Sequence, residues 1–179
     1  MNLFMESVSM PAIALQDLHH YYPLEFNSLH GPINEWKDIQ LLQRPTFNEV
    51  LMYSSQLMQG DVCISRTDDT RQRYNTYAVG CRENGRQPID DILEKANGYP
   101  YLITENLFPY DLADAEHWLL FMLHKDCTIE GAQHELVRWS QENGVSLEKV
   151  FAYQNPYGLR SIPEFPHFQL IIKTPFRSL

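Results

Sequence analysis

Cysteine is scarce in this chain, and its three cysteines lie far apart. Cys63, Cys81 and Cys127 form no C-x-x-C motif, and their number is odd. A disulfide framework or a zinc knuckle needs several closely spaced cysteines, so both are disfavoured. The cysteines therefore predict reduced thiols, as in a cytoplasmic or nuclear protein.

Long apolar runs and basic clusters are missing as well. No stretch reaches the roughly 18 apolar residues of a membrane-spanning helix. The amino terminus has no basic segment before an apolar core, so no secretory signal is predicted either. The 14 lysines and arginines are scattered through a chain with a formal net charge of −9. A nucleic-acid partner is therefore not expected, whereas a small anionic ligand needs only a local cluster of positive charge.

The residues that build a hydrophobic core are plentiful. Apolar residues make up 44% and aromatic residues 12% of the 179 positions. A chain of this length buries roughly 70% of the surface that it exposes when unfolded, so it needs no disulfide or metal to fold. We expect an N-terminal extension over residues 1–30 and one domain over residues 31–179.

Periodicity and capping residues predict the main elements. Helices are expected at about 46–58, from Pro88 to about 96, and from Thr128 to Gly144. Residues 61–86 indicate short strands and loop, including a strand over YNTYAVG. HWLLFMLH is apolar on both faces, which is typical of a central strand, and KVFAYQ and HFQLIIK are further strands. Together these predict an α+β domain with a mixed or antiparallel sheet of about five strands and three to four helices.

Several polar residues stand at the ends of these buried strands. They are His117, His167, Asn155, Arg160 and Ser161. Arginine presents a planar fork of donors that matches a phosphate, and two histidines could bind a ligand or transfer protons. If the strands share a sheet, these residues could converge on one rim and bind a phosphorylated small molecule. Each also has a structural interpretation, in which the histidines bond backbone carbonyls and Arg160 fastens its own loop.

Four short motifs follow one another along the chain in a recognisable order. They are W-x-x-I at Trp36 with L-x-R-P at Leu42, a helix ending at Gly60, N-x-F-P-Y with H-W-x-L at Asn106 and His117, and N-P-x-x-L-R-S-I-P-x-x-x-H at Asn155. In this order the chain resembles the N-acetylglucosamine-induced protein family, a mostly fungal domain of unknown function. The resemblance covers about residues 33–173 and implies a link to amino-sugar metabolism. It also adds Asn106 and Tyr110 to the candidate ligand-binding residues.

The chain departs from the family pattern at two places. Gln169 stands where the family often has a second histidine, and Phe121 replaces a tryptophan. A metal-dependent hydrolase using His117 and His167 is disfavoured by Gln169.

Two other hypotheses remain open, a protein that binds a sugar phosphate or nucleotide sugar and a regulatory module that binds a protein partner. The sequence indicates no cofactor and does not decide whether the protein is an enzyme.

Overall fold

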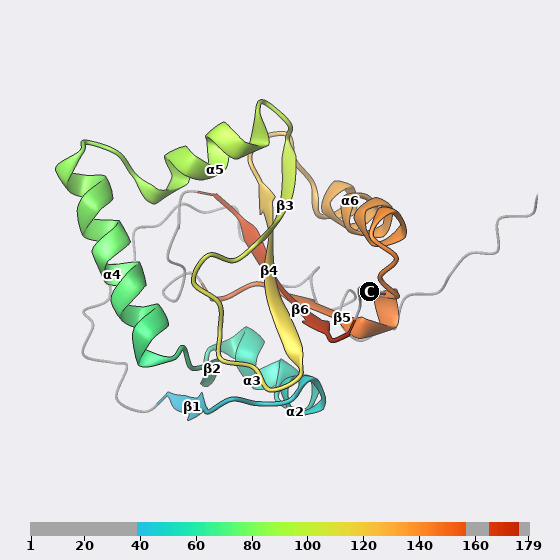
Figure 1. Ribbon diagram of the computed structural model, residues 1–179. Coiled ribbons are helices and arrows are strands. Elements are labelled where there is room, and N and C mark those ends of the chain that lie inside the picture. Colours follow the sequence, from blue (N-terminus) through green and yellow to red (C-terminus); the bar gives the residue numbers. More distant parts are fainter. Residues whose placement is uncertain (1–38, 157–164, 176–179) are drawn as a thin grey trace, which may run out of the picture.

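Two β-sheets and five helices make up the computed structural model, which describes residues 39–156 and 165–175 (Figure 1). The strands are β1 (Gln40–Leu42), β2 (Val62–Ile64), β3 (Tyr101–Glu105), β4 (Ala115–Met122), β5 (Val150–Tyr153) and β6 (His167–Lys173). The helices are α2 (Phe47–Met52), α3 (Ser54–Gln59), α4 (Asp68–Glu83), α5 (Pro88–Ala96) and α6 (Ile129–Glu142), with a short 3₁₀ helix at Leu147–Lys149. The larger sheet is antiparallel in the order β3–β4–β6–β5, and β1 and β2 form a parallel pair.

The predicted central strand lies in the middle of the larger sheet. β4 pairs with β3 on one side and with β6 on the other, so its backbone is paired on both edges. Trp118 and Leu120 face one side of the sheet and Phe121 the other, and all three are buried. The double-sided apolar pattern of β4 and β6 is therefore explained by cover on both faces.

Helix α6 covers one face of this sheet (Figure 1). Its Ala132 and Leu136 join Trp118, Leu170 and neighbouring side chains in one buried cluster. The helix begins where predicted, because the hydroxyl of Thr128 accepts a hydrogen bond from the N–H of Gly131.

The other face is covered at one end by α2, α3 and the β1–β2 pair. Phe47, Val50 and Leu57 pack there against Phe151 and Ile171. The predicted helix at 46–58 is present as two short helices that meet at Tyr53. The predicted apolar stripe is present, but its spacing does not predict the break in the backbone between the two helices.

Residues 68–83 form one helix, so the predicted loop and strand at this place are wrong. Helix α4 carries almost no apolar stripe, since Thr70 and Cys81 are its only buried residues. It is fixed by its Thr67 cap and by aromatic contacts of Tyr74 and Tyr77 with a distant loop. Hydrophobic periodicity cannot reveal a helix that is held in this way.

The fold class is confirmed as a single α+β domain, although six strands and five α-helices are described instead of about five and three to four. The expected extension at residues 1–30 lies outside the described part of the chain. Across the described ranges, no helix combines the length and apolar character that a membrane crossing requires.

Gly131 provides a test of the packing between β3 and α6. The hydroxyl of Tyr101 accepts a bond from the N–H of Thr128 at 3.0 Å, and a Cβ atom on Gly131 would overlap that hydroxyl. We expect Gly131→Ala to lower the free energy of unfolding by about 1–3 kcal/mol, measured by urea denaturation. Gly80→Ala in α4 is the matched control, because a Cβ there meets no atom within 4 Å. It should raise stability by about 0.5–1 kcal/mol, and equal losses in both variants would contradict this account.

Candidate functional site

The loop between β3 and β4 brings the first candidate residues together. The side-chain oxygen of Asn106 accepts the N–H of Phe108 at 2.9 Å, and the N–H of Asn106 donates to the carbonyl of His117 at 3.0 Å. These two bonds turn the chain so that Tyr110 folds back over the start of β4. Asparagine at this position therefore shapes the loop locally.

His117 is the centre of a buried polar network. Its side chain is 4% exposed, and both ring nitrogens are hydrogen-bonded. Nδ1 accepts the N–H of Tyr110 at 3.0 Å, and Nε2 lies 2.7 Å from Oε1 of Gln169. Because Nδ1 acts as an acceptor, the proton belongs on Nε2, which donates it to Gln169.

The surroundings of His117 keep its ring uncharged. Burial lowers the pKa of His117 to about 3 and outweighs the hydrogen bond to Gln169, which acts to raise it. The positive charge of Arg66 acts in the same direction as burial. The ring of Tyr110 stacks on the imidazole with centroids 4.1 Å apart. Nδ2 of Asn106 lies 3.3 and 3.4 Å from the two ring nitrogens, so it contacts the ring as a whole. An uncharged imidazole with a hydrogen bond at each ring nitrogen is suited to positioning its neighbours.

Arg66 lies on the far side of Tyr110 from this network. Its Cζ is 5.1 Å from the centre of the Tyr110 ring and 5.9 Å from that of Tyr74, and its Nε donates to the carbonyl of Phe108 at 2.8 Å. The side chain is half-buried. Within residues 39–156 and 165–175 it has no ion pair and no other hydrogen bond.

The hydroxyl of Tyr110 connects the site to β5. Nδ2 of Asn155 donates to this hydroxyl at 3.1 Å. Tyr153 is 1% exposed, and burial raises its pKa well above the ordinary value, with Tyr110 acting in the same direction. Arg66 acts on the pKa of both Tyr153 and His117, so its charge lies close to both buried rings.

Gln169 occupies the middle of the same sheet face. Its side chain is 3% exposed, and it pairs in register with Leu119 of β4 and Tyr153 of β5. Its oxygen accepts from His117.

His167 is on the same face but at its other end. It pairs with Phe121, whereas His117 pairs with Ile171, so the two histidines are four residues apart along the antiparallel strands, roughly 13 Å. Nδ1 of His167 lies 3.0 Å from the carbonyl of Phe165. Because the strands run in opposite directions, the starts of β4 and β6 cannot meet at one rim.

The candidate residues thus divide into three groups. Asn106, Tyr110, His117 and Asn155 meet in one site, His167 lies apart on the same face, and Arg160 and Ser161 fall outside the described residues. In the described ranges no three His, Cys, Asp or Glu side chains gather as metal ligands. Roles of these residues in binding or proton transfer stay predictions.

Three residues of the site were not singled out as ligand-binding candidates. Gln169 had a visible signal, because it is a lone amide in the otherwise apolar strand HFQLIIK. Arg66 had none, since it lies in a polar run between elements. Tyr153 had the pattern of an ordinary core residue of a strand.

No family model matches this chain, and no curated protein is significantly similar to it. A crystal structure of a protein called HTC1 superposes with a TM-score of 0.49 and 17% identity, over 72% of this chain and 83% of that chain.

The buried imidazole predicts a loss of stability in acid. The pKa of His117 is lowered in the folded chain, so at falling pH the unfolded chain takes up the proton first. The contribution should be complete above about pH 6.5 and should decline between about pH 6.5 and 3. We expect urea denaturation to show on the order of 2 kcal/mol less stability at pH 5 than at pH 7.5 from this group.

Two variants and one spectrum check this interpretation. His117→Gln should flatten the dependence on pH, whereas His134→Gln, at an exposed position of α6, should leave it unchanged. Ring ¹⁵N shifts of the wild-type protein should show an uncharged His117 protonated on Nε2 at pH 5. A charged ring at that pH would contradict the argument even if His117→Gln does not fold.

Proposed function

We propose that this protein binds a small phosphorylated molecule at Arg66, next to the ring of Tyr110. One observation supports this proposal above the others: Arg66 is half-buried, fixed by two aromatic rings and a carbonyl, and without an ion pair among the described residues. Its Nε is engaged, which leaves the terminal nitrogens of the guanidinium for an anion. A guanidinium held in this way offers parallel donors to phosphate oxygens.

Other arginines of the chain show the contrast. Arg138 pairs with Glu135 and Glu142, and Arg86 pairs with Asp91 and Glu94. These four carboxylates neutralise the two cations and occupy their donors. Among the described residues, Arg66 has only a neutral carbonyl as a hydrogen-bond partner, and no carboxylate there neutralises its charge.

Two further arginines add positive charge near this place. Arg71 donates to the carbonyl of Arg66 at 3.4 Å, and Arg73 donates to the carbonyl of Leu107 at 3.5 Å. Arg71 also lies 3.4 Å from Asp68, so part of its charge is offset. A local cationic cluster in a chain of net charge −9 supports an anionic ligand.

The buried network gives His117 a positioning role in this proposal. It holds Tyr110 by a hydrogen bond and by stacking, and Tyr110 in turn supports Arg66. Asn155 bonds the hydroxyl of Tyr110, and Arg160 and Ser161 follow it by five and six positions in the sequence. We propose that these two residues complete the anion site. An amino-sugar phosphate or a nucleotide sugar is the proposed ligand class, on the family resemblance.

A regulatory or protein-interaction module remains the second proposal. It is favoured by the same network, because both nitrogens of His117 find their partners inside the protein. In that case Arg66 would serve to fasten the loop through the carbonyl of Phe108.

Removal of the charge at Arg66 separates the two proposals. Arg66→Met keeps the aliphatic stem against Tyr110 and deletes the guanidinium. We expect phosphate, a sugar phosphate or a nucleotide sugar to raise the melting temperature of the wild-type protein by mass action. The rise should be lost in Arg66→Met and kept in Arg82→Met, because Arg82 is exposed and bonds only the carbonyl of Ala78 in its own helix.

The same assay should include Arg160→Ala and a chelator. Loss of the ligand effect in Arg160→Ala as well would place both arginines on one anion. An effect that depends on free metal would point to the hydrolase hypothesis instead. The ligand proposal is wrong if no phosphorylated compound stabilises the wild-type protein at millimolar concentration.

A further inference from the structure

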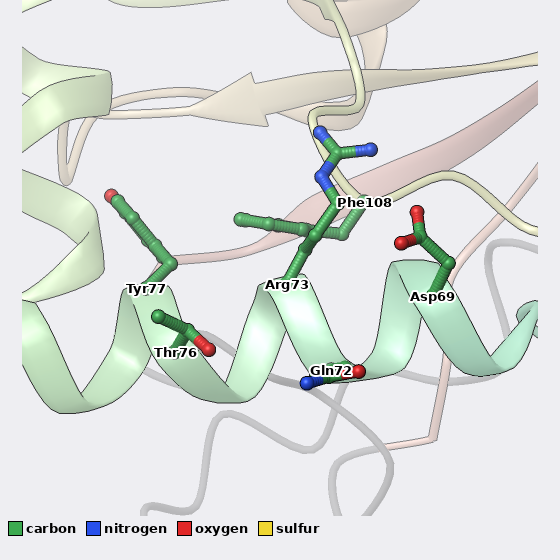
Figure 2. A pocket seen from close by; sticks show the side chains of 6 residues that line it. All are labelled: Asp69, Gln72, Arg73, Thr76, Tyr77 and Phe108. Atoms are coloured by element: carbon green, nitrogen blue, oxygen red, sulfur yellow. The ribbon is translucent and has the colours of Figure 1, made fainter.

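An open groove runs along α4 and shares Phe108 with the surroundings of Arg66. It encloses about 510 Å³, within the usual range for small-molecule sites. Its lining residues are Asp69, Gln72, Arg73, Thr76, Tyr77 and Phe108 (Figure 2). Five of them recur at helical spacing on one face of α4, and Phe108 comes from the loop between β3 and β4.

Exposed polar side chains make up much of the groove. In the described part of the chain, Asp69, Gln72 and Thr76 make no side-chain hydrogen bond or ion pair. Arg73 makes only the 3.5 Å bond to the carbonyl of Leu107. A carboxylate accepts, a guanidinium donates, and an amide and a hydroxyl do both. This set matches a molecule with many hydroxyl groups, since each hydroxyl is at once a donor and an acceptor.

The two charges in the groove do not neutralise each other. Asp69 and Arg73 are four residues apart on one helix, a spacing at which opposite charges commonly pair. Both side chains extend toward the same side of α4 in Figure 2. No ion pair joins them. With one charge of each sign present, these two residues give the groove no net charge, which suits an uncharged ligand.

The apolar part of the groove is held rigidly. The ring of Phe108 lies 5.2 Å from those of both Tyr74 and Tyr77, measured between centroids. The backbone N–H of Phe108 donates a hydrogen bond to the side-chain oxygen of Asn106, and the backbone carbonyl of Phe108 accepts one from Nε of Arg66. The hydroxyl of Tyr77 donates to Asp91 at 2.5 Å, which fixes that ring in turn. A rigid apolar surface lowers the entropic cost of binding.

We infer that this groove is a second binding site, which takes the ring of an uncharged sugar. The C–H groups of a pyranose would pack against Phe108 and Tyr77, and its hydroxyls would bond Asp69, Gln72, Arg73 and Thr76. The inference does not depend on the Arg66 proposal, because a neutral sugar requires no bound anion.

Titration of the ¹⁵N-labelled protein with D-glucose tests the site. We expect amide shifts at Gln72–Tyr77 and at Phe108 that saturate in the millimolar range. Sorbitol is the control ligand, because it carries hydroxyls but no rigid ring face, and it should shift these amides less. Asp69→Asn should weaken the affinity about tenfold, the effect of losing a charged hydrogen-bond acceptor.

A matched control variant shows whether the loss of any nearby negative charge would weaken glucose binding. Asp68→Asn removes a neighbouring carboxylate from the same helix turn, and its side chain is 99% exposed. It should leave glucose binding unchanged. The inference is overturned if glucose moves no amides of the groove, if sorbitol acts equally, or if both aspartate variants weaken binding alike. Weaker glucose binding in Asp69→Asn, while phosphate still stabilises that variant, would show two separate sites.

Discussion

The two hydrogen bonds of His117 link the loop between β3 and β4 to β6, in addition to the backbone pairing of β4 with β6. One nitrogen holds the loop between β3 and β4 through the N–H of Tyr110, and the other holds β6 through Gln169. Burying a polar ring is costly unless its partners are supplied. Here both are supplied from within the protein, so the network fixes one geometry for the loop and one tautomer for the ring.

The position of Arg66 follows from that geometry. The loop presents the carbonyl of Phe108 and the face of Tyr110, and these two groups orient the guanidinium. Phe108 in turn docks the polar helix α4 through Tyr74 and Tyr77. A short loop thus connects the buried network of His117, the guanidinium of Arg66 and a groove on α4. This arrangement places groups of different chemistry close to one another without mutual neutralisation.

Much of the fold could be predicted from local patterns. The strands β4 and β6 could be predicted from their apolar residues on both faces. The helices α5 and α6 could be predicted from their apolar stripes and from Pro88 and Thr128 at their starts. Helix α4 could not be predicted, because its stability comes from caps and from contacts with a loop 30 or more positions away in the sequence. Such contacts leave no period in the sequence.

The candidate site shows the same division. Residue type and neighbouring positions are enough to predict the central strand with His117, the loop that carries Asn106 and the polar position Gln169. They do not predict that His117 faces Gln169, that His167 lies at the opposite end of the face, or that Arg66 rests on Tyr110. The reason is physical: strand direction and register set which side chains meet, and both are fixed by pairing between distant segments.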